Sequence, residues 1–244
     1  MSTPSESTGP APRSVRPFLL VWFAVSAVAV LAHFALSPRM GLYEDDHFLI
    51  GTPMCEWGPA NLKASLKHAF LAYQQGRPLQ YGLGYLLTYV GTHAGGLTGA
   101  YVLAAAVWVL NAGLCLALLW RGYGAVAATV TALLFVLVPA DTTHPLLHTA
   151  FYVHTSVALL LLSGNAYARG RTVLSVLFAA LTLITYETCF LPALVWPLMF
   201  PSPTRSMVRR CLTHGLALGV VLVLGIAVRV QFGEERTADR KSVV

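Results

Sequence analysis

Long apolar runs separated by short polar segments dominate the chain. Seven runs cover residues 17–36, 98–120, 125–139, 151–168, 172–185, 190–200 and 212–230, and a shorter one covers 81–92. Because an α-helix rises about 1.5 Å per residue, roughly 20 apolar residues cross a hydrocarbon core of about 30 Å. The pattern predicts an all-α protein, a polytopic transmembrane helical bundle.

The composition points to the same class. Hydrophobic residues make up 56% of the 244 residues and charged residues 11%, against about 25% charged in a typical soluble domain. The formal net charge of +6 would suggest a nucleic-acid partner in a soluble protein. Here most basic residues lie in short clusters between the apolar runs, without interleaved aromatic residues, so we expect no nucleic-acid partner.

The run at 81–92 decides the topology, because 12 residues of helix rise only about 18 Å. If this run does not span, the segments 1–16, 121–124, 169–171 and 201–211 all face the cytoplasm. They contain eight arginines and one acid, and nine of the ten acids then lie outside. This is the distribution that the positive-inside rule predicts. We therefore expect about seven spans in the plasma (inner) membrane, with a cytoplasmic N-terminus and 81–92 against the outer leaflet.

Three regions follow from this topology. Residues 1–16 are rich in Ser, Thr and Pro and predict a disordered cytoplasmic tail. Residues 17–231 form the transmembrane module, with a long outer loop at 37–96. Residues 232–244 are a polar tail without a further span, so we expect the sequence to be the N-terminal part of a longer membrane protein.

The outer loop contains a predicted amphipathic helix. Leu62, Leu66 and Phe70 recur at helical spacing, and Lys63 and Lys67 lie on another face. Such a helix would lie in the interface plane, with its basic side toward the headgroups of membrane lipids. It would be either a structural cap over the bundle or part of an entrance for a lipid substrate.

Three consecutive acids, Glu44, Asp45 and Asp46, follow the first span. Ionised carboxylates are not left in hydrocarbon, so these residues must face water. Adjacent like charges repel one another, which makes a simple helix stop a poor explanation. We therefore expect at least one of the three to have a function.

Further polar residues are predicted at the same outer face. They are Arg77 in the segment 76–79, Asp141, His144 and His148 after Pro139, and Tyr186 with Glu187. A general base and an anion-binding group above a membrane cavity would use such a set.

Each of these residues also has a structural interpretation. Arg77 would extend to a lipid headgroup, Asp141 would cap a helix, and Glu187 would be a solvated span end. Asp141, His144 and His148 have the spacing of metal ligands on a helix, although Pro145 interrupts it. No Walker-type loop, GxGxxG, HExxH or GxSxG motif occurs, so nucleotide binding, zinc proteolysis and serine hydrolysis lack support.

Together these motifs resemble the GT-C superfamily of integral-membrane glycosyltransferases, particularly the GtrII-like branch, over residues 17 to about 230. The matching features are Asp45-Asp46 at the start of the outer loop, the segment 76–79, Asp141 after Pro139, and Tyr186-Glu187. The resemblance implies an inverting glycosyltransferase that moves a sugar from a polyprenyl-phosphate donor to a cell-envelope glycan, lipid or protein at the periplasmic face. The C-terminal region of the family is missing, so the chain by itself would lack acceptor specificity or activity.

The resemblance also implies roles for individual residues. Asp45 or Asp46, with Asp45 favoured, would be the general base, and Arg77 would bind the donor phosphate. Asp141, His144 and Glu187 would orient acceptor or sugar hydroxyls or help to bind a metal, and Tyr186 would also bind substrate. No cofactor is assigned, but a divalent metal is an alternative, held by Glu44, Asp46 and His148.

Two other classes compete with the enzyme. A transporter or flippase component predicts acids near the middle of the bilayer and an internal repeat. The acids here lie at predicted span ends and no repeat is present. In a non-catalytic assembly subunit, the outer acids would be dispensable.

Overall fold

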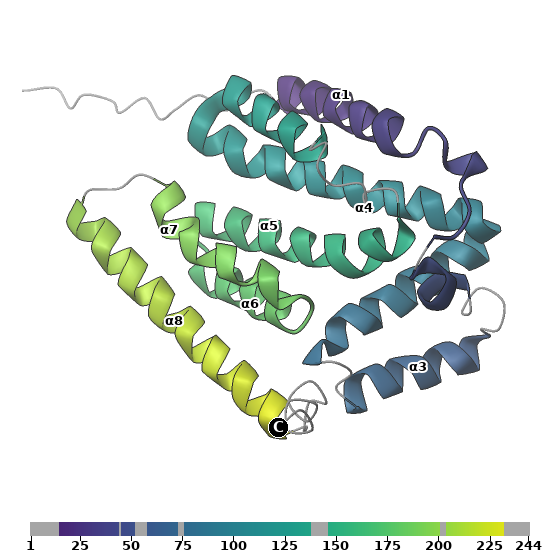
Figure 1. Ribbon diagram of the computed structural model, residues 1–244. Coiled ribbons are helices and arrows are strands. Elements are labelled where there is room, and N and C mark those ends of the chain that lie inside the picture. Colours follow the sequence, from purple (N-terminus) through teal and green to yellow (C-terminus); the bar gives the residue numbers. More distant parts are fainter. Residues whose placement is uncertain are drawn as a thin grey trace, which may run out of the picture.

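The computed structural model describes residues 15–43, 45–51, 58–72, 76–137, 146–200 and 204–231. These residues form helices and turns, and no strand occurs among them, which confirms the all-α prediction. The α-helices are α1 (Val15–His33), α3 (Pro59–Leu71), α4 (Pro78–Leu137), α5 (His154–Ala168), α6 (Thr172–Leu183), α7 (Trp196–Met199) and α8 (Thr204–Gln231) (Figure 1). The shorter helical turns are η1 (Ser37–Arg39), η2 (His47–Gly51), η4 (Thr149–Val153), η5 (Glu187–Cys189) and η6 (Leu191–Val195).

Three glycines break α4 into separate rods. Gly95 has extended φ and non-helical ψ, while Gly96 and Gly124 have φ values of 59° and 84°, a region that strains residues with a Cβ atom. The rods cover 78–94, 97–123 and 125–137, and Figure 1 shows them turning back on one another. The first rod extends the predicted run at 81–92 at both ends. Its role as a helix against the outer leaflet is still a prediction.

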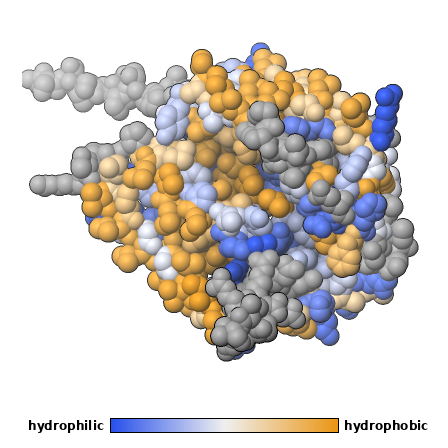
Figure 2. Space-filling model, viewed as in Figure 1, coloured by the Kyte–Doolittle hydropathy of each residue, from blue (hydrophilic) through white to orange (hydrophobic). Residues whose placement is uncertain are grey.

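Three helices of the described chain are long and apolar enough to cross a membrane. They are α1, α4 and the part of α8 from Ser206 to Gln231. Large apolar side chains of α8, such as Leu216, Val220 and Val223, are exposed, and Figure 2 shows hydrophobic atoms over much of this helix. An extended exposed apolar surface is what a lipid environment covers. These three helices are compatible with a membrane protein, and the seven spans are still a prediction.

The predicted run at 190–200 is not one continuous helix. It begins after η5 and consists of η6 and α7, with Pro192 and Pro197 near the start of each. Proline has no backbone N–H and is best accommodated in the first turn of a helix, which explains why new helical turns begin at these positions. This segment packs between α5 and α8, where His214 donates through Nε2 to the Ala193 carbonyl at 3.0 Å.

The core lies in two adjoining clusters. One packs α1 against α4 and η4 around Trp108, whose side chain is fully buried. The other packs α5, α6, η6 and α8 around residues such as Leu118, Phe190 and Trp196. The 97–123 rod contributes to both clusters, so it is the central strut of the bundle.

Arginines gather at one end of the bundle, which we call the arginine end. Phe18 near the start of α1 contacts Trp120 edge to face, with ring centroids 5.6 Å apart. Burial and the nearby charges of Arg121 and Arg171 lower the pKa of Arg169, so these three arginines are neighbours. Arg210 of α8 donates to the hydroxyl of Tyr167 at 3.2 Å. Four arginines from three of the segments that the sequence predicts to be cytoplasmic therefore lie at the same end of the bundle.

The contact between the first two rods of α4 provides a stability test. A Cβ atom added at Gly91 would lie 2.8 Å from the Ala100 Cα atom, whereas one at Gly219 would have nothing within 4 Å. We expect Gly91→Ala to lower the free energy of unfolding in detergent by roughly 1–3 kcal/mol, because backbone at a helix crossing cannot move aside easily. The matched control Gly219→Ala should leave it unchanged or slightly higher. Equal effects of the two variants would contradict this packing.

Candidate functional site

Asp46 anchors the loop that the sequence predicts on the outer face. Its side chain is fully buried, and Oδ1 accepts hydrogen bonds from the backbone N–H of His148 at 2.7 Å and from Nδ1 of the same residue at 2.8 Å. Oδ2 accepts from the backbone N–H of Leu147 at 3.2 Å. These N–H groups belong to the start of a helical segment, where they have no partner within the helix. Asp46 therefore caps that segment from a position 102 residues away in sequence.

Asp45 differs from its neighbour, because it is exposed. Its backbone carbonyl accepts from the N–H groups of Phe48 and Leu49 at 3.1 and 2.8 Å, which fixes the turn leading into η2. Of the two predicted candidates for a general base, Asp46 is thus engaged in three hydrogen bonds and shielded from water, whereas Asp45 is exposed.

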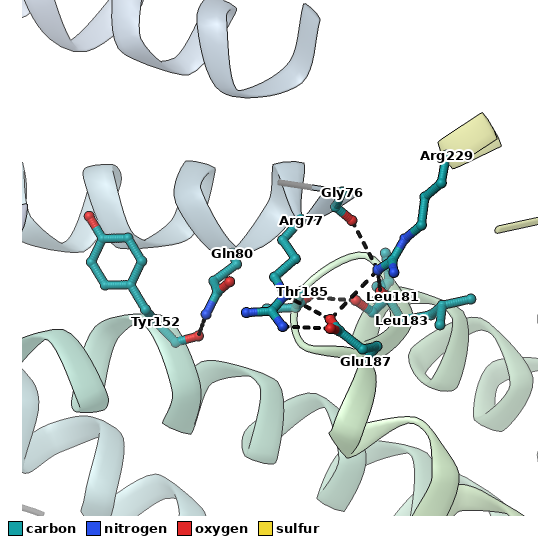
Figure 3. A network of polar contacts seen from close by, with 9 residues as sticks. All are labelled: Gly76, Arg77, Gln80, Tyr152, Leu181, Leu183, Thr185, Glu187 and Arg229. Carbon is teal, nitrogen blue, oxygen red and sulfur yellow. Dashed lines mark hydrogen bonds and ion pairs between the residues drawn. The ribbon is translucent and has the colours of Figure 1, made fainter. Parts of the chain in front are cut away.

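Arg77 and Glu187 form a bidentate ion pair. Nε of Arg77 donates to Oε2 at 2.7 Å and Nη2 donates to Oε1 at 2.5 Å, as the dashed lines in Figure 3 show. The side chains are 13% and 30% exposed, so the pair lies at the edge of the protein interior. Two parallel charge-assisted bonds fix both the distance and the plane of the guanidinium group.

The ionisation of this pair follows from its surroundings. Burial would raise the pKa of Glu187, but hydrogen bonds from Arg77 and the charges of Arg77 and Arg229 lower it to about 2. Burial would also lower the pKa of Arg77, which the bonds and charge of Glu187 offset, so that it is raised. Both groups are therefore charged at neutral pH.

Arg229 and Tyr186 complete this cluster. Nη2 of Arg229 lies 3.6 Å from Oε2 of Glu187 and donates to the carbonyls of Gly76 and Leu183 at 3.1 and 3.3 Å. The ring of Tyr186 faces the guanidinium of Arg77 at 4.5 Å, a cation–π contact. We call Arg77, Tyr186, Glu187 and Arg229 the arginine–glutamate cluster.

Three chain segments meet in the arginine–glutamate cluster. The backbone N–H of Leu79, at the start of α4, donates to the Ile184 carbonyl at 3.2 Å. The hydroxyl of Thr185 donates to the Leu181 carbonyl at 2.6 Å, which closes the end of α6 (Figure 3). Arg229 brings the last turn of α8 to the same place. Figure 2 shows hydrophilic atoms in the middle of this face, near the loop that follows α6 in Figure 1.

A chain of contacts joins the cluster to Asp46. Three residues after Arg77, the side-chain amide of Gln80 donates to the Tyr152 carbonyl at 3.1 Å. Tyr152 lies four residues after His148, the partner of Asp46. The first rod of α4, which follows Arg77, thus packs against the η4 region, which follows the partner of Asp46.

The predicted site residues are therefore divided. The structure brings Arg77, Tyr186 and Glu187 together and joins Asp46 to His148, while Asp45 is exposed beside Asp46. Glu44, Asp141 and His144 lie outside the described residues. Within the described chain, no group of three His, Cys, Asp or Glu side chains is placed to hold a metal ion.

Two residues that contribute to these contacts, Arg229 and Gln80, were not among the site residues predicted from the sequence. Arg229 is the single charged residue of the run 212–230, and a lone charge in a span was a usable signal. Gln80 had no such signal, because its role depends on packing against Tyr152.

Comparisons with protein-family models, curated proteins and solved structures give no match for this chain.

The unequal burial of the two adjacent acids predicts unequal effects on stability. We expect Asp46→Asn to lower the free energy of unfolding in detergent by about 2–4 kcal/mol, because it removes charge-assisted bonds and leaves buried N–H groups poorly paired. The matched control Asp45→Asn should change it by no more than about 0.5 kcal/mol. Similar losses in the two variants would show that Asp46 is not an anchor.

Proposed function

We propose that the chain is the transmembrane module of an inverting glycosyltransferase that uses a polyprenyl-phosphate-linked sugar. One observation carries the proposal: an apolar helical protein has an exposed carboxylate, Asp45, and a fixed guanidinium, Arg77, on segments that are connected through the hydrogen bonds of Asp46 to His148 and of Gln80 to Tyr152. A lipid-phosphate donor needs an apolar surface for its chain, a cation for its phosphate and a base for the acceptor. The resemblance of the sequence motifs to the GT-C superfamily supports the same reaction.

Asp45 is the proposed general base. Its carboxylate takes the proton of an acceptor hydroxyl while the hydroxyl oxygen attacks the anomeric carbon of the donor sugar. The bond between that carbon and the phosphate oxygen breaks, and its electron pair leaves with the polyprenyl phosphate, which inverts the anomeric configuration. The burial of Asp46 supports the choice of Asp45, since a base must reach the proton that it removes.

Arg77 is the proposed ligand of the donor phosphate. Its Nε and Nη2 atoms are paired with Glu187, and in Figure 3 its Nη1 atom points away from Glu187, toward the side of Gln80 and Tyr152. A guanidinium held in this way meets a phosphate oxygen without losing further side-chain freedom. Glu187 then acts on Arg77 and does not need to contact a sugar hydroxyl.

The proposal includes a direction across the membrane. The arginine end would face the cytoplasm with the N-terminus, and Asp45 and the arginine–glutamate cluster would face outward, in the plasma (inner) membrane. The gathering of four arginines at the arginine end supports this direction, because cytoplasmic segments of membrane proteins are enriched in basic residues. The donor and the cell-envelope acceptor would then meet at the periplasmic face.

Labelling of single cysteines in intact cells tests this direction. We expect an impermeant maleimide to label His47→Cys, two residues after Asp45, and to label Arg121→Cys only after the cells are opened, because the two residues would lie on opposite faces. The variants are built in a background in which the native cysteines are replaced by serine. Labelling of both cysteines from one side would reject the proposed topology.

Sugar transfer tests the reaction. We expect Asp45→Asn in the full-length protein to lower transfer from a polyprenyl-phosphate sugar at least about 100-fold, because a general base contributes on the order of 10²–10⁴. The unfolding temperature should equal that of the unmodified protein. Asp45→Glu, which keeps a carboxylate, should retain more transfer than Asn. Unchanged transfer by Asp45→Asn would remove this mechanism and favour a transporter or assembly subunit.

A further inference from the structure

Among the residues that the structure describes, the arginine–glutamate cluster contains three charged side chains. Arg77 and Arg229 each carry one positive charge and Glu187 one negative charge, so the three sum to +1. Tyr81, Tyr186 and Cys189 also face these charges, and none of them is a carboxylate or an imidazole. Glu187 touches both arginines, at 2.5 Å and 3.6 Å, so it lowers the positive potential at each of them.

The two lipid phosphates of the proposed reaction differ in charge. A sugar linked through phosphate to a polyprenol is a phosphodiester with one negative charge. The lipid phosphate that leaves is a monoester, which carries about 1.5 to 2 negative charges at neutral pH because its second pKa is near 6. A site with a stronger positive potential would hold the product more tightly than the donor.

We propose that Glu187 tunes the charge of the anion site: by offsetting one of the two arginines, it weakens the preference of the site for the doubly charged phosphomonoester product over the singly charged phosphodiester donor. This inference rests on the proposed function, which places the donor phosphate at Arg77. It gives Glu187 a second role besides holding the guanidinium plane. Arg229 is the balancing cation, without which Glu187 would neutralise Arg77.

Net charge distinguishes this role from a structural one. Glu187→Gln would bring the cluster to +2, Arg229→Gln would bring it to 0, and the double variant would return it to +1. The double variant lacks both side chains, so a purely structural role predicts the largest defect there. The charge role predicts a return to the selectivity of the unmodified protein.

The experiment measures binding by the purified full chain in detergent at pH 8. The probes are farnesyl phosphate and its methyl ester, methyl farnesyl phosphate, which share one apolar chain and differ by about one charge. The readout is the ratio of the diester Kd to the monoester Kd. We expect Glu187→Gln to raise this ratio about three- to tenfold, and Arg229→Gln to lower it by a similar factor, as one charge near 6 Å in a wet site would.

Two controls separate charge from shape. At pH 5 the monoester is mostly singly charged, so the ratios of all variants should converge. Glu187 itself is still ionised there, since its pKa is about 2. Arg229→Lys keeps the charge and should keep the ratio of the unmodified protein at pH 8. Thermal unfolding of every variant shows which are folded, and Arg229→Gln alone fixes the sign if Glu187→Gln does not fold.

The outcomes are distinct from those of the transfer assay. Equal ratios in all folded variants, a double variant that does not return to the original ratio, or no binding of either probe would each overturn the inference. Asp45→Asn should bind both probes normally. If the predicted ratios hold but Asp45→Asn still transfers sugar, the anion site stands and only the Asp45 mechanism is rejected.

Discussion

The cost of leaving a charge unpaired at the edge of an apolar protein governs this structure. An ionised carboxylate with few water contacts is tolerated only when hydrogen bonds or opposite charges compensate it. The described residues contain three carboxylates, and the two that are shielded, Asp46 and Glu187, are both fully engaged. Their partners are 102 and 110 residues away in sequence. Each pair therefore fixes the relative position of two distant chain segments. Apolar contacts between helices fix such positions less sharply, because they have little directional preference.

The local sequence pattern was sufficient to predict most of the helices, but it was insufficient to predict which side chains pair with one another. The apolar runs predicted the positions of α1, α5 and α6 because period and length are local properties, whereas α8 begins at Thr204, within the segment predicted as a connection before the run at 212–230. The first rod of α4 extends beyond the apolar run at 81–92, since Pro78 opens the helix and Gly95 and Gly96 end it. The proline-rich run at 190–200 is broken into short turns for a reason also visible in the sequence, as proline restarts helices and does not continue them.

The division between Asp45 and Asp46 could not be read from the sequence. Both are aspartates after the same span, and which one points inward depends on the phase of the turn leading to η2 and on helix N–H groups 102 residues away. The pairing of Arg77 with Glu187 is likewise non-local, so the sequence indicated two separate substrate contacts where the structure shows one ion pair. Arg229 is the lone charge of its apolar run, but nothing local in that run indicates that its partners are Gly76, Leu183 and Glu187.

The Asp46–His148 pair and the Arg77–Glu187 pair are connected through a short series of contacts. Asp46 is tied to His148, four residues further Tyr152 accepts from Gln80, and three residues before Gln80 stands Arg77. Each step follows helical backbone or a short hydrogen bond. The distance between Asp45, which is adjacent to Asp46, and the guanidinium of Arg77 therefore has little freedom to vary. A reaction that joins a base, an acceptor and a phosphate requires such a fixed separation, because misplacement by about 1 Å can cost about 100-fold in rate. In this fold Asp46 and Glu187 act on other protein groups, and the proposed function depends on whether the contacts that they make hold Asp45 and Arg77 at such a separation.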